Sequence, residues 1–93
     1  MYLEIISPET TLYSGDVTSV AVPSVDGEFE MLNNHAAIVA ILKEGYVKIY
    51  GNITLAENVE SKFTKAENRQ GFYLPINSGT VEMKDNRVIV LVD

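Results

Sequence analysis

Short runs of β-branched and aromatic residues, separated by turn-forming pairs, recur along the whole chain. The turn pairs come about every 8 to 12 residues, which is the spacing typical of a β-sandwich or barrel. Strands are predicted for the runs Tyr2–Ile6, Val17–Pro23, Tyr46–Tyr50, Phe72–Ile76, Thr80–Lys84 and Val88–Val92. Turns are predicted at Ser7-Pro8, Ser14-Gly15, Asp26-Gly27, Asn33-Asn34, Glu44-Gly45, Gly51-Asn52, Asn77-Ser78-Gly79 and Asp85-Asn86. The pattern therefore predicts an all-β fold.

The last two runs give the clearest local predictions. Thr80–Lys84 alternates apolar and polar residues, so one face is expected to be buried and the other wet. Val88–Val92 is apolar throughout, which predicts a strand with little solvent on either face. Asp85-Asn86 joins the two as a two-residue hairpin, because both residue types tolerate positive φ. Pro75 cannot donate a ladder hydrogen bond, so its strand is expected at a sheet edge or a bulge.

The secondary structure of two stretches cannot be predicted from their residue pattern. Ala36–Leu42 fits a buried strand or a helical turn, and periodicity does not separate these readings. Asn52–Gln70 is polar and evenly charged, so the stretch of about 50–70 is interpreted as an extended hairpin or a mobile insertion. Its removal is expected to leave the sandwich folded, since loop length costs little closure entropy.

Length and composition set limits on the type of protein. The 93 residues form one domain, and the absence of cysteine excludes disulfides and thiolate zinc sites and fits a reducing compartment. The longest apolar run, Ala36–Leu42, is too short for a membrane span, and no signal peptide opens the chain. A cytosolic protein is expected, with any membrane connection made through a partner.

The net charge of −6 is distributed unevenly. Residues 1–42 contain no Lys or Arg, whereas the rest of the chain holds equal numbers of acidic and basic residues. The acidic residues of this first part are Glu4, Glu9, Asp16, Asp26, Glu28 and Glu30. Nucleic acid would be repelled by this half, and a basic partner would be attracted, although a merely solvated acidic surface is the other reading.

The sequence contains little that indicates a catalytic or metal-binding site. His35, the single histidine, stands between Asn34 and Ala36 in a turn, and no nucleophile motif surrounds any serine. Asp26, Glu28 and Glu30 would share one face of a strand, but Gly27 sits too early for a calcium loop. We expect no catalytic, cofactor or metal site, and interpret the three carboxylates as an acidic docking hairpin.

One alternative attaches a prosthetic group. Met83-Lys84, beside a hairpin in a small β domain, is similar to the Met-Lys pair of biotinyl and lipoyl carrier domains. Those domains place the lysine within the turn itself, whereas Lys84 precedes the Asp-Asn turn. The carrier reading, with Lys84 as the attachment site, is therefore kept as the alternative. A free-standing ligand-binding β-sandwich is a third possibility.

A succession of motifs resembles one known family. The chain offers Ile5-Ile6-Ser7-Pro8-Glu9, Leu12-Tyr13-Ser14-Gly15, Val17–Pro23, Asp26-Gly27-Glu28-Phe29, His35-Ala36, Leu42–Ile49, Gly79–Met83 and Asn86–Asp93. This order resembles the N-terminal β-sandwich of the epsilon subunit of F-type ATP synthase, over nearly the whole chain except about residues 50–70. The number of pieces in order makes the resemblance specific.

The resemblance implies a ten-stranded β-sandwich, or flattened barrel, at the foot of the central stalk of a bacterial ATP synthase. It implies binding to the γ subunit and to basic loops of the membrane rotor ring (the c subunits), at the cytoplasmic face of the inner membrane. By position, the ring contact falls on Asp26, Gly27, Glu28 and Glu30, and the γ contact on Ser7, His35 and Ala40. The implied role is a non-catalytic rotor subunit that couples proton flow to ATP synthesis.

The chain departs from the family at several points. The family usually has Gly at Glu30, Pro-Gly or Pro-Asn at Asn33-Asn34, and often Gly-Gly at Ser78-Gly79. It also continues beyond the position of Asp93 into a two-helix C-terminal domain, which this sequence lacks. The inhibitory and ATP-binding roles of that domain are therefore not expected here.

Overall fold

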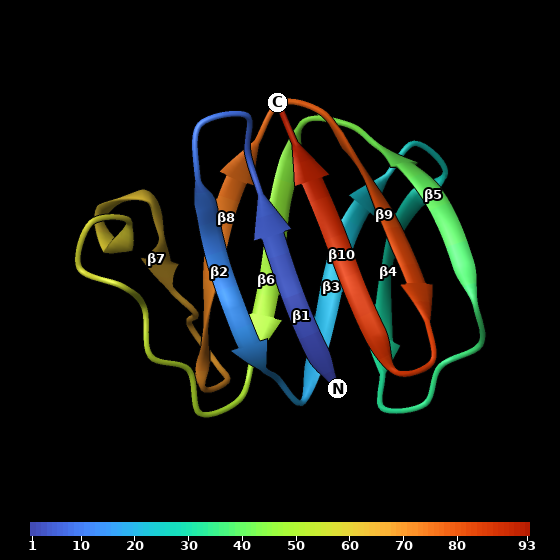
Figure 1. Ribbon diagram of the computed structural model, residues 1–93, viewed down its shortest axis with the longest axis horizontal. Helices are drawn as coiled ribbons and strands as arrows, with labels where there is room; N and C mark the ends of the chain where they lie inside the picture. The colour runs from blue at the N-terminus through green and yellow to red at the C-terminus, as the bar shows by residue number, and fades with distance from the viewer.

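The computed structural model describes residues 1–93 and consists almost entirely of β-strands (Figure 1). One 3-10 turn, η1 (Glu60–Lys62), interrupts them. The strands are β1 (Tyr2–Ile6), β2 (Thr11–Asp16), β3 (Ser19–Ser24), β4 (Gly27–Leu32), β5 (Ile38–Leu42), β6 (Gly45–Tyr50), β7 (Thr64–Lys65), β8 (Gly71–Ile76), β9 (Gly79–Lys84) and β10 (Arg87–Val92).

The strands form one curled sheet of ten members in the order β2-β1-β10-β9-β5-β3-β6-β8-β7, with β4 paired to β3. All pairs are antiparallel except β1 with β10. β5 touches β3 at a single pair, Ser24 with Leu42, and there the sheet folds over. Figure 1 shows the result as two layers, with β2, β1, β10 and β9 in front of β8, β6, β3 and β4. The predicted all-β, ten-stranded sandwich is confirmed.

The core lies between the layers and is built by alternation along each strand. A cluster of 20 buried apolar residues fills it, including Leu3, Val20, Ile49 and Val90, none of which exposes any surface. Most strands supply alternate side chains to this cluster because successive side chains point to opposite faces of a sheet, whereas β2 supplies the adjacent Leu12 and Tyr13 and β7 supplies none. In β9, Val81 and Met83 point inward, as the alternation of Thr80–Lys84 predicted.

The β9–β10 hairpin confirms one prediction and corrects another. Asp85 and Asn86 form its turn with φ of 52° and 61°, the left-handed values that these residue types accept. β10, however, is not buried on both faces: Leu91 is 49% exposed and Ile89 only partly buried. The two-sided prediction was wrong because β10 is flanked within its layer by β1 and β9, and no element packs on the outer face.

Several strand boundaries differ from the predictions. β2 was not predicted, and the supposed turn at Ser14-Gly15 lies inside it, paired with β1. The run Val17–Pro23 begins as a connection and becomes strand β3 only at Ser19. Ala36–Leu42 resolves as a strand, since β5 pairs with β9 from Ile38 onward. β7 reaches only Phe72 and Tyr73 of β8, so Pro75 stands beyond it, where no strand lies outside β8.

The stretch of about 50–70 is packed against the sandwich, and its last part forms a short antiparallel hairpin because β7 pairs with β8. η1 and β7 fold it against the sandwich, and its side chains Val59, Phe63 and Ala66 are buried. Val59 and Phe63 belong to the main core cluster, and Ile53 and Leu55 pack against it. The polar composition hid these anchors because single apolar residues in irregular segments leave no period.

Candidate docking surfaces

Five segments meet at one end of the sandwich, the upper end in Figure 1. They are the turns after β1, β3, β5 and β8 and the end of β10, because successive antiparallel strands return alternate turns to the same end. Four exposed carboxylates stand there: Glu9, Asp26, Glu44 and Asp93. Lys43 is the one basic residue in these segments. We call this surface the acidic end.

The β3–β4 turn presents Asp26 through local hydrogen bonds. The Ser24 hydroxyl donates to the carbonyl of Gly27 (2.6 Å) and accepts from the N–H of Asp26 (3.2 Å). Gly27 has a φ of +122°, which a side chain would make unfavourable. Asp26 therefore projects from a tight, internally bonded turn with its carboxylate exposed.

Backbone hydrogen bonds tie this turn to its neighbour. The N–H of Val25 donates to the carbonyl of Ile41 (3.0 Å), and the N–H of Lys43 donates to the carbonyl of Pro23 (2.9 Å). The β3–β4 and β5–β6 turns are thus held side by side. Asp26 and Glu44 consequently belong to one continuous acidic surface.

The other two carboxylates predicted to face the ring form ion pairs within the domain. Glu28 pairs with Lys48 of β6 at 3.0 Å, and Glu30 pairs with Arg69 at 2.9 Å. Both pairs cross over β3, whose side chains opposite them are the small Ala21 and Pro23. Of the predicted acidic hairpin, only Asp26 lies in the turn itself; Gly27 begins β4, and Glu28 and Glu30 lie along the face of that strand.

Arg69 is the centre of a cluster that closes the 51–70 segment onto β3, β4 and β6. Its guanidinium donates to both carboxylate oxygens of Glu30 and to the hydroxyl of Ser19 (3.0 Å), and stacks 3.6 Å above the ring of Tyr50. These hydrogen bonds lower the pKa of the Glu30 carboxyl. Burial, aided by the neighbouring Tyr73, raises the pKa of Tyr50 to about 12.

The three residues matched to a γ contact do not form one cluster. Ser7 follows β1 at the acidic end, where its hydroxyl donates to the carbonyl of Thr10 (3.1 Å) and accepts from the Thr10 N–H. His35 lies in the β4–β5 loop at the opposite end, and Ala40 is partly buried in β5. β1 and β5 run in the same direction with β10 and β9 between them, so Ser7 and His35 are separated by the sheet.

The His35 loop is organised by hydrogen bonds among loop residues. The His35 Nδ1 atom lies 2.7 Å from the carbonyl oxygen of Ala36, so this nitrogen carries the proton and donates. The side-chain oxygen of Asn86 accepts from the Asn34 N–H (2.8 Å), and its amide donates to the side-chain oxygen of Asn33 (3.0 Å). His35 therefore has the role of a turn residue. No group of three or more His, Asp or Glu residues is arranged to hold a metal ion.

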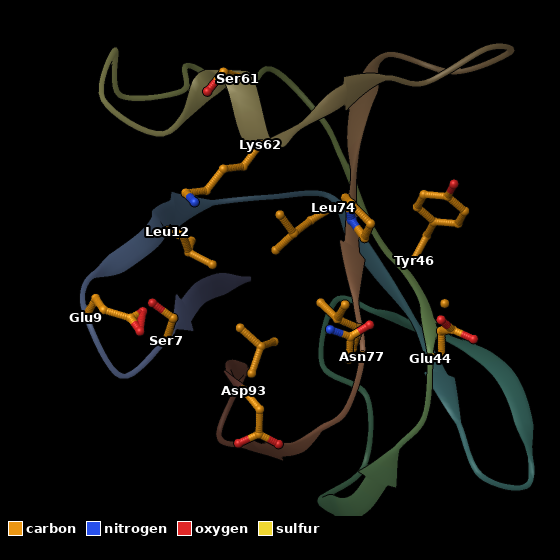
Figure 2. Close-up of a pocket in the computed structure, with 14 residues that line it drawn as sticks. Ser7, Glu9, Leu12, Glu44, Tyr46, Ser61, Lys62, Leu74, Asn77 and Asp93 are labelled. Carbon is orange, nitrogen blue, oxygen red and sulfur yellow. The ribbon is translucent and has the colours of Figure 1, made fainter.

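A hollow of about 830 Å³ opens beside the acidic end (Figure 2). Leu12 and Leu74 provide apolar surface, Glu9 stands beside Ser7, Asp93 lines the hollow at the end of β10, and Lys62 reaches in from η1. Three carboxylates, Glu9, Glu44 and Asp93, line the hollow against the single cation Lys62, which extends the acidic surface inward. No helix in the structure is long and apolar enough to cross a membrane.

Sequence reasoning missed Glu9, Glu44 and Asp93 as partners of Asp26. Each stands in or beside a predicted turn or at the end of the last strand. The signal that could have found them is the alternation of turns between the two ends in a series of antiparallel strands. This rule can be applied only when every strand is known, and neither β2 nor β4 was predicted from the sequence.

The comparisons with known proteins agree with this architecture. A family model described as ATP synthase, Delta/Epsilon chain, beta-sandwich domain matches residues 1–93. The ATP synthase epsilon chain of Campylobacter fetus is 37% identical over the whole chain, which covers 60% of that relative. The epsilon chain of Chlorobium limicola is 32% identical over 91 residues, covering 86% of its length. The chain thus spans about 60% of the length of the Campylobacter relatives.

A solved structure shows the same fold. It is titled as the central stalk and c-ring of the mitochondrial ATP synthase of Tetrahymena thermophila. The matching chain superposes with a TM-score of 0.68 at 17% identity, over 98% of this chain and 61% of its own length. At that identity the likeness establishes the fold alone.

These matches decide between the two main hypotheses from the sequence. They correspond to epsilon chains and not to biotinyl or lipoyl carriers, and Lys84 is an exposed residue that precedes the turn at the end of β9. An epsilon chain is a subunit of an enzyme complex and not its catalytic chain, as expected for this domain. The chain belongs to the ATP synthase delta/epsilon family, of which it comprises the β-sandwich domain.

Proposed function

We propose that this domain is a non-catalytic rotor subunit in the central stalk of an F-type ATP synthase, linking the γ subunit to the membrane rotor ring. The acidic end is the observation that carries the proposal. Glu9, Asp26, Glu44 and Asp93 are exposed there, and no ion pair neutralises any of them. Ring loops of basic character, as the family resemblance implies, are the complementary partner.

The proposed ring contact is centred on the β3–β4 turn. Asp26 lies in it and Gly27 directly follows it, whereas Glu28 and Glu30 are held by Lys48 and Arg69. The two paired carboxylates would meet the ring only at the margin of the contact. Proton flow would then be coupled to ATP synthesis by rotation of this domain with the ring, at the cytoplasmic face of a bacterial inner membrane.

The γ contact is proposed along the sheet. Because Ser7 and His35 lie at opposite ends, a partner that reaches both, as well as Ala40, must extend along the length of the strands. Exposed apolar side chains favour a protein partner on the β5–β9–β10 face, where Ile41 (63% exposed) and Leu91 (49%) both lie beside Thr80.

Charge reversal at the turn tests the ring contact. Asp26→Lys leaves the ion pairs of β4 intact, so the variant is expected to fold normally and to bind isolated γ. Each exposed charge pair contributes about 0.2–1 kcal/mol and is screened by salt, so retention on the ring should fall several-fold at low ionic strength and recover as salt rises.

Asp16→Lys is the matched control, since it makes the same charge change at the opposite end of the molecule. Retention is measured by co-sedimentation with membranes that contain the ring, at two salt concentrations, together with proton-driven ATP synthesis. Equal retention of Asp26→Lys, Asp16→Lys and the wild type at low salt would show that the acidic end is solvated surface only.

A further inference from the structure

Sheet edges that lack a neighbouring strand expose hydrogen-bonding groups and invite pairing with other chains, so folded proteins usually protect them. Here β2, β4, β5 and β7 each lack a partner along one side. Three of these edges carry a recognisable protection. β2 forms an irregular ladder opposite Ile5 and Ile6 and exposes polar side chains, β4 carries Glu28 and Glu30, and β7 is only two residues long.

The edge of β5 has no such protection. Its exposed side chains are Val39 and Ile41, which are 72% and 63% exposed, without a charge, a proline or a bulge. β9 pairs with β5 over its whole length on one side, whereas on the other side β3 meets it only at Leu42. In Figure 1, β5 is the outermost strand on the right.

The register shows which backbone groups are free. The carbonyl of Ile41 accepts a hydrogen bond from Val25, so it points away from β9. Residues two apart in a strand direct their N–H and C=O groups to the same side. The N–H and C=O of Val39 and the N–H of Ile41 therefore face the open edge, while Ala40 faces Val81 of β9.

We propose that the edge of β5 receives an extended strand of the γ subunit, which adds to the sheet beside Val39 and Ile41. This inference rests on the proposed function and specifies how γ is bound. The free edge accommodates about four residues, or roughly 13 Å of strand. Main-chain hydrogen bonds supply the attachment, and alternate side chains of the added strand pack beside Val39 and Ile41.

The negative charge around the β5 edge indicates which kind of strand can bind there. Residues 1–42 hold no Lys or Arg, and Glu82 faces the same side as its partner Val39 in the neighbouring strand. An apolar strand flanked by basic residues complements this edge. A second copy of this chain, which carries the same net charge of −6, is repelled by it.

Two variants separate backbone pairing from side-chain packing. Val39→Pro keeps an apolar side chain but removes the outward N–H, and proline is tolerated on the open side of an edge strand. Val39→Ala keeps the N–H and removes most of the side chain. Binding to purified γ subunit of the same source is measured by calorimetry, after circular dichroism has shown that each variant keeps the wild-type fold.

Strand addition predicts that Val39→Pro weakens γ binding about tenfold or more, because one hydrogen bond and the close approach of the added strand are lost, whereas Val39→Ala weakens it only about threefold. Hydrogen exchange by NMR supplies a test that needs no variant. The amides of Val39 and Ile41 should exchange rapidly in the free domain and become protected in the complex, while the amide of Ala40 is protected in both.

Four outcomes overturn the proposal. If Val39→Pro binds γ as the wild type does, or if the Val39 and Ile41 amides stay unprotected in the complex, γ is bound without strand addition and only this inference fails. If the wild type does not bind γ at all, the proposed stalk function fails with it. If Val39→Pro instead abolishes a wild-type dimer seen by sedimentation, a second copy occupies the edge.

Discussion

Phe63 fastens the 51–70 segment to the sandwich, and we expect its truncation to alanine to destabilise the whole domain. The side chain is 8% exposed and belongs to the main core cluster, together with Val59 from the preceding turn of the same segment. The segment is therefore part of the folding unit. An expendable insertion would tolerate the change.

The expected loss follows from the burial. Removing a buried phenylalanine side chain costs about 3–5 kcal/mol, and the lower figure applies where an irregular segment can relax into the space. A loss of about 3 kcal/mol is a large share of the roughly 5–15 kcal/mol that stabilises a domain. For a chain of this length it lowers the thermal midpoint by about 12–24 °C.

Urea denaturation followed by circular dichroism measures the change, since the chain has no tryptophan. Glu60→Ala is the control, because Glu60 is an exposed residue of η1 in the same segment, and its loss should stay within about 0.5 kcal/mol. A Phe63→Ala variant as stable as Glu60→Ala would refute the assignment of this segment to the core.

Two further predictions concern the sheet. Val90→Asp places a carboxylate at a position with no exposed surface, so a loss of at least about 3 kcal/mol is expected, and an unchanged unfolding midpoint would contradict it. Arg69 lowers the pKa of Glu30, so this carboxylate stabilises the fold above its unfolded pKa of about 4.3 and ceases to do so as the pH falls through the lower folded value. Glu30→Gln should therefore be about 0.2–1 kcal/mol less stable than the wild type at neutral pH and equally stable near pH 2. Chemical denaturation across this pH range measures the difference. A difference that persists in acid would show that the Glu30–Arg69 ion pair is not its cause.

Local chemistry could be predicted from the sequence where neighbouring residues alone determine it. The Asp85-Asn86 turn needs only two residues that accept positive φ, and the alternation of Thr80–Lys84 needs only one buried face. The two-sided burial of Val88–Val92 could not be judged in the same way. Whether a second layer covers the outer face of β10 depends on how the sheet folds at the pair Ser24–Leu42.

The partners of the charged residues also depend on segments that are distant in sequence. Asp26, Glu28 and Glu30 looked like three crowded carboxylates without a cation, because the nearest basic residue in sequence is Lys43. Glu30 meets Arg69, which is 39 residues away, and Glu28 meets Lys48 from β6. Lys48 becomes a neighbour because β4 and β6 pair with opposite sides of β3, and Arg69 because the loop between β7 and β8 folds back onto β3 and β4. No spacing rule along the chain could reveal them.

The ion pairs of Glu28 and Glu30 also distinguish these two carboxylates from those at the acidic end. Glu28 and Glu30 stabilise the fold through cations from the second half of the chain, so the first-half excess of acid is partly neutralised on the sheet face. At the acidic end, four carboxylates and one lysine leave a charge of −3, which is half of the formal net charge of −6. Like charges gathered at one end repel one another and favour unfolding slightly. Folding alone does not favour this arrangement, and the basic partner proposed for that end would offset the repulsion.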